Sequence, residues 1–515
     1  MAEIERFSLI PAEKGFYNRS VNKKTVPFAN EIALQQPLRP ALTPVGSNVD
    51  YSRAKGELDE MDRLLADSGV ESMAVELALE STQKLSSKRT ETLARFAIQS
   101  IRTETLRWYL GGISFRALSK AICSSDLYAR FCRVIDIEGI RGVSKSTLER
   151  SSKLFDDSAM DRLLKELTAK SVDEEGSARI GLDKPLQVSA VLIDGTCLEA
   201  NVHYPVDWVL LKDCARTLLK AVELIREMGL RQRMPRTPAE LARDMNKLCI
   251  AFSNTRRQKD GKKTRKKLLR KIVKLARLVA GHARTHADLL ASSKRDAKKT
   301  LKQAEAILSR INSNLAMLPD LEKQARERII GERQVDADKK ILSIHDLDIS
   351  VISKGKSGTP SEFGNQLLIA ETLDGYIVDS KLHRGQAPSE TKQLPLSLER
   401  IKGLGIELAE VVTDRGFSSQ ANSKALGKGI YDCTAPRSVK DLEQRLQEER
   451  FRILQKRRAG TESRIATLKN RWLGGRLKAK GFDNRERALK GSILAHNLWI
   501  LVRIIENQSP LAKAA

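Results

Sequence analysis

The chain has 515 residues, and its 91 Lys and Arg against 65 Asp and Glu give a formal net charge of +26. This length accommodates about two to four domains, and the positive surplus favours a polyanionic partner because basic contacts to phosphates release condensed counterions. Six scattered cysteines without a Cys-x-x-Cys pair argue against a zinc ribbon and a secreted disulfide framework. With no secretory signal and no apolar run of roughly 18 residues, we expect a cytoplasmic protein without a membrane partner.

The N-terminal third divides into an arm and a helical region. Residues 1–60 contain five prolines and little periodicity, which predicts an extended arm. Residues 61–160 show apolar residues at helical spacing, with Ser114 as an expected N-cap and Ser144 or Ser146 as another. The second of these short helices carries Lys145, Arg150 and Lys153 and could belong to a helix-turn-helix reader of DNA. An ordinary helical bundle with basic exposed faces explains the same pattern.

Residues 185–205 form a short apolar, strand-like segment that reaches Asp194-Gly195, and residues 206–339 are again helical and strongly basic. We expect 206–339 to be a basic helical, coiled-coil-like insertion that grips DNA or a second subunit, although such a charge run can also be a solvated face. His282 and His286 stand four residues apart, but no further ligand accompanies them, so surface histidines are expected.

Strand-like segments return in residues 340–507, followed by a helix, a strand that ends in Asp414, one more strand and a helical C-terminal part. This order is typical of an RNase H-like core interrupted by an insertion after its first strand. The predicted fold class is therefore mixed α/β and largely helical, with the core formed by 185–205 together with 340–507.

Two aspartates at the ends of apolar strands suggest a metal site. Asp194 closes VSAVLID and Asp414 closes ELAEVVTD, so each would project from a rigid sheet edge. Phosphodiester cleavage without a covalent intermediate can use two divalent ions about 3.5–4 Å apart, and hard cations such as Mg²⁺ or Mn²⁺ prefer carboxylates. The alternative is that Asp-Gly and Asp-Arg-Gly are only turn signals.

A third carboxylate is expected on the C-terminal helical part. Arg458, Glu462 and Lys469 lie four and seven residues apart, so at about 100° per residue they share one helix face within roughly 40°. A plain surface helix with an Arg–Glu pair is the alternative. Gly460-Thr461 could also begin a fresh helix, and Glu448 is almost in phase with Glu462.

Four ordered segments resemble the DDE transposases of bacterial insertion sequences. They are VLIDGTCLEANVHYP (191–205), KGKSGTPSEFGNQLLIAE (354–371), VVTDRGFSSQAN (411–422) and RRAGTESRIATLKNRWLGGR through ILAHNLWIL (457–501). Many relatives carry Tyr, two residues, Arg, three residues, Glu, six residues and Lys. Arg458, Glu462 and Lys469 match that frame, while Gln455 stands where the tyrosine would be.

The resemblance implies that Asp194, Asp414 and Glu462 are catalytic and hold two Mg²⁺ or Mn²⁺ ions. Water would first cleave at the transposon end, and the freed 3′-hydroxyl would then attack target DNA. Arg458, Lys469 and Arg415 would contact DNA. The implied partners are double-stranded terminal inverted repeats and target DNA, bound by a homodimer or larger assembly in the nucleoid. Two alternatives stay open at this point: an RNase H-like nuclease without strand transfer, and a non-enzymatic, domesticated DNA-binding protein.

Overall fold

The computed structural model describes residues 39–508, except for 43, 81, 83–85, 204–205, 256–258, 294–297, 337–338 and 354–360. Residues 1–38 of the expected N-terminal arm lie outside the described residues, as do 354–360 of the second motif and 204–205 of the first. The arm was expected to extend to residue 60, but helix α1 (Val49–Asp67) begins earlier, with the Asn48 side chain accepting a hydrogen bond from the Tyr51 amide.

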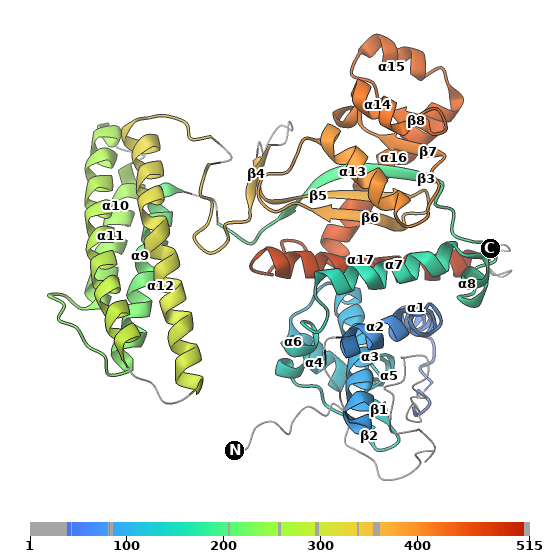
Figure 1. The fold of residues 1–515 in the computed structure, drawn as a ribbon, viewed down its shortest axis with the longest axis horizontal. Helices are drawn as coiled ribbons and strands as arrows, with labels where there is room; N and C mark the ends of the chain where they lie inside the picture. Colours follow the sequence, from blue (N-terminus) through green and yellow to red (C-terminus); the bar gives the residue numbers. More distant parts are fainter. Residues whose placement is uncertain are drawn as a thin grey trace.

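The fold is mixed α/β and mostly helical, as predicted, and Figure 1 shows N-terminal helices, a central sheet and a separate helical bundle. The N-terminal elements are α1, α2 (Val70–Glu80), α3 (Ser87–Tyr109), α4 (Phe115–Cys123), α5 (Asp126–Phe131), β1 (Ile135–Asp136), β2 (Gly139–Ile140), α6 (Lys145–Ser151), α7 (Asp157–Val172) and α8 (Glu174–Arg179). Ser114 caps α4 as expected, and Ser144 rather than Ser146 caps α6 by accepting from the Thr147 amide.

The sheet combines antiparallel and parallel pairs. Its strands are β3 (Ala190–Glu199), β4 (Ser350–Ser353), β5 (Ser361–Thr372), β6 (Ile377–Leu382), β7 (Glu410–Thr413) and β8 (Tyr431–Thr434). Strand β5 pairs antiparallel with β3 on one side and with β4 and β6 on the other. Strand β7 then pairs parallel with both β3 and β8. The order β6-β5-β3-β7-β8 therefore places β3 in the centre.

Helices cover both faces of this sheet. Alternate residues of a strand point to opposite faces, so Val191 and Ile193 of β3 face one way and Leu192 and Asp194 the other. The first face packs against α13 (Glu390–Lys402). Helix α14 (Gln420–Leu426) connects β7 to β8 along the chain. The second face packs against α16 (Glu449–Thr467), η5 (Leu468–Trp472) and α17 (Phe482–Gln508). Elements η4 (Arg415–Phe417) and α15 (Val439–Arg445) complete this part.

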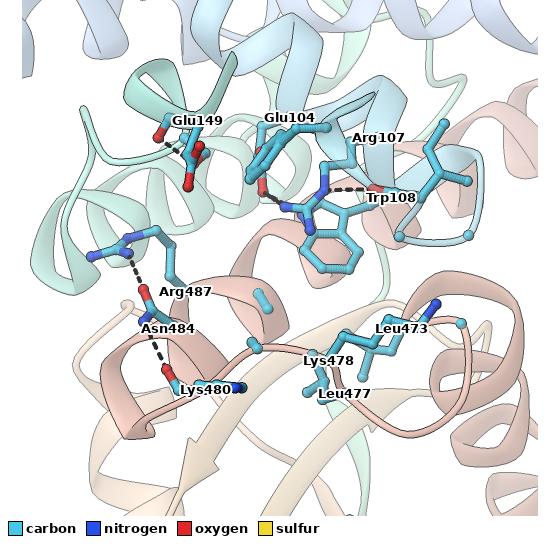
Figure 2. Close-up of a pocket in the computed structure, with 18 of the residues that line it drawn as sticks. Glu104, Arg107, Trp108, Glu149, Leu473, Leu477, Lys478, Lys480, Asn484 and Arg487 are labelled. Carbon is cyan, nitrogen blue, oxygen red and sulfur yellow. Dashed lines mark hydrogen bonds and ion pairs between the residues drawn. The ribbon is translucent and has the colours of Figure 1, made fainter. Parts of the chain in front are cut away.

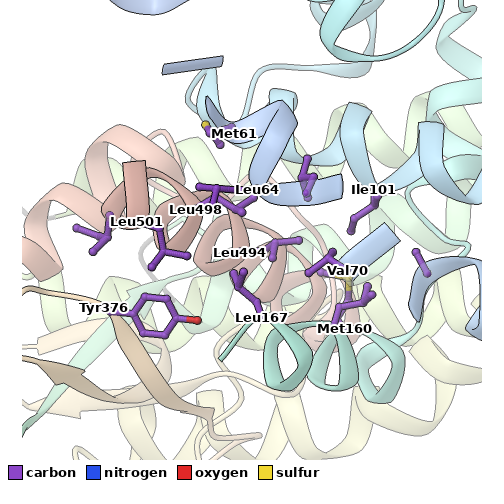
Figure 3. Packing of buried hydrophobic residues seen from close by; sticks show 14 of the residues in the cluster. Met61, Leu64, Val70, Ile101, Met160, Leu167, Tyr376, Leu494, Leu498 and Leu501 are labelled. Carbon is purple, nitrogen blue, oxygen red and sulfur yellow. The ribbon is translucent and has the colours of Figure 1, made fainter. Parts of the chain in front are cut away.

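Helix α17 holds the N-terminal helices against the sheet. Figure 3 shows Leu494, Leu498 and Leu501 of α17 packed between Leu64 of α1 and Leu167 of α7. In the described part of the chain it is the one helix long and apolar enough to cross a membrane, but most of it is buried inside the fold. A core helix that touches apolar surfaces on several sides needs this composition.

Residues between β3 and β4 form a bundle with its own hydrophobic core. Its helices are α9 (Asp207–Glu227), α10 (Pro238–Asn254), α11 (Gly261–Ser292) and α12 (Lys298–Ala325), followed by the π-helix η3 (Arg326–Ile330). Apolar residues of the basic α11, including Leu269, Ile272 and Val279, face inward and leave its cations outside. The expectation of two surface histidines was wrong for His286, which is fully buried beside Ala283 and Ala287.

Candidate active site

Asp194 lies within a strand rather than at the end of one. The sequence predicted that the strand closes at Asp194, but β3 continues to Glu199 because β5 pairs with it along that entire length. What does end there is the parallel neighbour, since the last β3–β7 partners are Ile193 and Thr413. Asp194 is therefore the first residue of β3 whose β7 side is open.

Asp414 stands directly beside Asp194. Asp414 follows Thr413, the last residue of β7, and Asp194 follows Ile193, which is the β3 partner of Thr413. Neighbouring strands are about 4.8 Å apart, so the two aspartates begin side by side. Leu192 and Val412, two residues earlier, both pack against α16 residues Phe451 and Leu454. By the same alternation, Asp194 extends from the α16 face, and Asp414 leaves β7 next to it.

Glu462 lies on the helix that covers this face. Helix α16 runs without interruption from Glu449 to Thr467, so Gly460-Thr461 does not begin a new helix, and Thr461 is buried. The Glu462 carboxylate is exposed, yet it is close enough to Asp194 to help raise the pKa of that aspartate. Lys469 lies beyond the end of α16, in the π-helix η5, which shifts it from the α-helical phase counted from sequence.

Arg458 and Gln455 connect α16 to the aspartates. Arg458 Nη1 is 3.8 Å from Asp194 Oδ2, and its Nε donates to Gln455 Oε1 at 3.0 Å. Gln455 Nε2 in turn donates to the carbonyls of Thr413 at 3.1 Å and Cys433 at 2.6 Å, at the ends of β7 and β8. The residue that replaces the tyrosine of the resemblance therefore fastens α16 to the sheet and orients Arg458.

A second contact fixes the same helix farther along. Arg464 Nη2 lies 2.6 Å from Glu371 Oε1, and Glu371 on β5 is only 2% exposed. This ion pair ties the turn that follows Glu462 to the sheet. Glu448, which was nearly in phase with Glu462, is engaged elsewhere, because it accepts from the Tyr431 hydroxyl at 2.7 Å and pairs with Arg445.

Glu390 is a fourth carboxylate that reasoning from the sequence missed. It is the first residue of α13 and approaches from the face opposite to α16. In the described part of the chain it makes no ion pair. The sequence shows only Ser-Glu-Thr before an apolar helix, which is an ordinary helix start. Its proximity to the aspartates depends on the course of residues 383–389, for which no local pattern gives a signal.

Two glycines make room for the Glu390 carboxylate. A Cβ placed on Gly195 would lie 3.1 Å from Glu390 Oε1, and a Cβ on Gly416 would lie 2.0 Å from Glu390 Oε2. Each glycine follows one of the aspartates within two positions, and its amide donates to that aspartate, at 2.7 Å for Asp194 and 2.8 Å for Asp414. The glycines therefore let a carboxylate reach over the sheet while their amides hold the two aspartates.

Burial and mutual repulsion favour the protonated carboxyl groups. Burial is the main reason that the pKa of Asp194 rises to about 6, and the neighbouring Asp414 and Glu462 raise it further, whereas the Gly195 amide and Arg458 oppose the rise. Burial likewise raises the pKa of Glu390, and its nearby carboxylates are again Asp414 and Asp194. This accumulation of negative charge at the sheet edge is what a bound cation would relieve.

The donor set fits a hard divalent cation in its chemistry. All four groups offer oxygen, which Mg²⁺ and Mn²⁺ prefer, and they lie on β3, α13 and α16 or directly after β7. Among the described residues, no three His, Cys, Asp or Glu side chains are arranged as a ready-made metal-binding group.

The other two cations predicted to contact DNA differ in exposure. Arg415 is exposed at the start of η4, immediately after Asp414, while its backbone carbonyl accepts from Arg437 Nε at 3.3 Å. Lys469 is half-buried. His203, which lies within the first motif, is instead paired with Asp213 of α9 at 2.9 Å.

Comparison with known proteins identifies part of this region. Residues 331–498 match the family model described as a transposase DDE domain, which supports a DDE transposase. The matched segment includes Asp414, Glu462 and Glu390 but begins after the strand that carries Asp194. No curated protein and no solved structure matches the chain.

Proposed function

We propose that this chain is a transposase of the DDE type, which binds transposon ends, cleaves DNA phosphodiester bonds with divalent metal and joins the 3′-hydroxyl end to target DNA. The observation that carries the proposal is the adjacency of Asp194 and Asp414 on parallel strands, beneath the helix that bears Glu462. The match of residues 331–498 to a transposase domain supports it independently.

The proposed catalytic core is RNase H-like and consists of residues 185–205 and 340–507. Its support is the strand order, in which three antiparallel strands are followed by two parallel ones, with the first strand central. Residues 206–339 would be an insertion into this core, and 61–160 a helical DNA-binding domain. A bacterial insertion sequence is the proposed origin.

In this proposal Asp194, Asp414 and Glu462 hold two Mg²⁺ or Mn²⁺ ions, with Glu390 close enough to assist. The ions would activate the attacking oxygen and offset charge on the phosphoryl group. The chain itself supplies a rigid carboxylate edge, because Gln455 and Arg464 fasten α16 to the strands. Arg458, Lys469 and Arg415 would bind DNA phosphates, and Arg458 also keeps Asp194 oriented.

The central test compares single carboxylate variants. Asp194→Asn, Asp414→Asn and Glu462→Gln should each abolish Mg²⁺-dependent end cleavage while duplex binding stays within about threefold of wild type. Glu448→Gln is the matched control, because Glu448 directly precedes the same helix but its carboxylate is bound to Tyr431 and Arg445. Normal cleavage by any of the three variants would remove that residue from the assignment.

A second assay distinguishes transposition from simple hydrolysis. A pre-cleaved end with a free 3′-hydroxyl should be joined to target DNA by wild-type protein, and the three variants should fail to join it. Hydrolysis without joining would instead indicate a nuclease, and tight, salt-sensitive binding without any cleavage would indicate a DNA-binding protein. Two ends must meet during joining, so a homodimer or larger complex should form on DNA.

A further inference from the structure

A basic cavity of about 420 Å³ lies between the N-terminal helices and the segment that joins η5 to α17. Figure 2 shows Arg107 and Trp108 of α3 on one side and Leu473, Lys478 and Lys480 of the joining segment on the other. Six cations and two carboxylates line the cavity. The cations are Arg107, Lys153, Arg476, Lys478, Lys480 and Arg487, and the carboxylates are Glu104 and Glu149.

The three arginines are already engaged within the protein. Arg107 donates to the Ile113 carbonyl and stacks between the Trp108 and Phe115 rings, with its guanidinium carbon 4.5 and 4.2 Å from their centroids. Arg476 pairs with Glu199 at 2.7 Å, and Arg487 donates to the Phe155 carbonyl at 3.2 Å. These contacts hold the three arginines in place as part of the cavity wall.

The three lysines are different. Lys153, Lys478 and Lys480 are exposed, and within the described residues none of them forms an ion pair. Three ammonium groups around one opening repel one another unless an anion is present. Lys acts as a compact point charge with three donors, so it can bind phosphate oxygens.

The cavity has a fixed relation to the carboxylates of the proposed active site. Its wall residue Leu477 forms a parallel bridge with Ala200, which directly follows β3, and Arg476 pairs with Glu199 at the end of that strand. Asp194 on β3 is six residues before Ala200, which is a distance of about 20 Å at 3.3 Å per extended residue. At about 3.4 Å per base pair, this separation corresponds to roughly six base pairs of B-form DNA.

A second cavity continues the basic lining toward the helical bundle. It measures about 610 Å³ and shares Ala479 and Lys480 with the first. Its other cations are Arg216 and Lys220 of α9 and Arg310 of α12. Lys480 therefore stands where the two cavities meet, and a ligand with repeating phosphates could follow both, whereas an isolated phosphate would engage only one.

We propose that the cavity beside Lys153, Lys478 and Lys480 binds the phosphate backbone of duplex DNA, about six base pairs from the phosphate that reacts at the carboxylates. This inference rests on the proposed function, because it assigns DNA to a chain with a DDE-type site. It adds a location and a distance that the function alone does not give.

Salt dependence of binding tests the contact directly. The slope of log K against log salt is negative, and each lost phosphate contact makes it shallower by about 0.9. Lys478→Ala/Lys480→Ala should therefore reduce the magnitude of the slope by about 1.8, and Lys153→Ala by about 0.9. Between 50 and 200 mM salt, the double variant should thus lose about twelvefold less affinity than wild type. Lys478→Arg/Lys480→Arg should retain the wild-type slope.

The matched control is Lys165→Ala/Lys184→Ala, which removes two exposed lysines that line neither cavity. Its slope should equal that of wild type, and all variants should keep the wild-type melting temperature. The proposal would be overturned if the slope for Lys478→Ala/Lys480→Ala equalled that of wild type. It would also be overturned if the control variant made the slope shallower by the same amount.

Phosphate ethylation interference on the duplex that wild-type protein cleaves tests the distance. The interference that disappears in Lys478→Ala/Lys480→Ala should lie about six base pairs from the cut, and a position more than about ten base pairs away would refute the geometry.

Inorganic phosphate that competes fully at millimolar concentration would indicate a small-anion site instead. If wild type binds DNA with the expected slope but never cleaves, the proposed function fails while this site stands. If it cleaves and the slopes are unchanged, only this inference fails.

Discussion

Gly416→Ala should disable the carboxylate site without unfolding the protein. The new Cβ would lie 2.0 Å from Glu390 Oε2 and 2.9 Å from Asp414 Oδ1, whereas an ordinary contact requires about 3.4 Å. The Glu390 carboxylate must therefore retreat by more than about 1 Å. Misplacement on that scale can cost about 100-fold in rate, and we expect a loss of that order in single-turnover, Mg²⁺-dependent end cleavage.

Stability should change far less, because the obstructing atom is the free end of a flexible side chain. Gly416 has no positive φ, so alanine adds no backbone strain, and overpacking should cost about 1–3 kcal/mol. Gly429→Ala is the control, since nothing lies within 4 Å of its added Cβ. If Gly416→Ala slows cleavage by displacing the Glu390 carboxylate, the alanine should have no further effect once that carboxylate is removed. Gly416→Ala/Glu390→Ala should then cleave no more slowly than Glu390→Ala. A Gly416→Ala rate within threefold of wild type, or losses that multiply in the double variant, would refute the reasoning.

Three further outcomes concern stability. Arg464→Ala should lower the free energy of unfolding by about 3–5 kcal/mol, because Glu371 would remain buried and unpaired, and denaturant titration should show a smaller loss for Arg464→Ala/Glu371→Leu. Burial lowers the pKa of His496 to about 4 from 6.5, so the unfolded chain takes up the proton first. Stability should thus fall by roughly 3 kcal/mol as pH drops from about 6.5 to 4, and a His496→Gln titration that retains this slope would contradict the assignment. Burial raises the pKa of Asp194 to about 6 from 3.8, so the unfolded chain releases this proton first; stability falls as pH rises from about 4 to 6, and the loss is complete above pH 6. Asp194→Asn should therefore stabilise metal-free protein at pH 7 by about 3 kcal/mol, and Mg²⁺ should raise the melting temperature of wild type only.

Local patterns predicted much of the fold. The helical spacing and caps of the N-terminal region, the mixed α/β composition and the strands that surround Asp414 all follow from short segments of sequence. Helix α16 also follows from its sequence, but its continuity through Gly460-Thr461 does not. Thr461 is buried against the fold, and packing of that kind overrides the low helix propensity of Gly and Thr.

Features that depend on distant partners were missed. The extension of β3 past Asp194 requires β5, roughly 170 residues later, so the Asp-Gly pair had the local signature of a turn. Burial of His286 depends on how the four helices of the bundle pack. Glu390 and Gln455 acquire their positions only when α13 and α16 meet the same sheet edge from opposite faces. The RNase H-like assignment and the metal ligands stay predictions.

The bundle between β3 and β4 also has a consequence for biosynthesis. At about 5–20 residues per second, a ribosome needs roughly 8–35 s after making β3 to deliver the β5 residues that pair with it. During that interval the apolar β3 has neither of its sheet neighbours. Helices α9–α12 share a core that is local in sequence, so they can fold first and keep the nascent chain compact. Slowed translation after Glu199 should therefore promote aggregation of the emerging polypeptide more than slowed translation after Thr372.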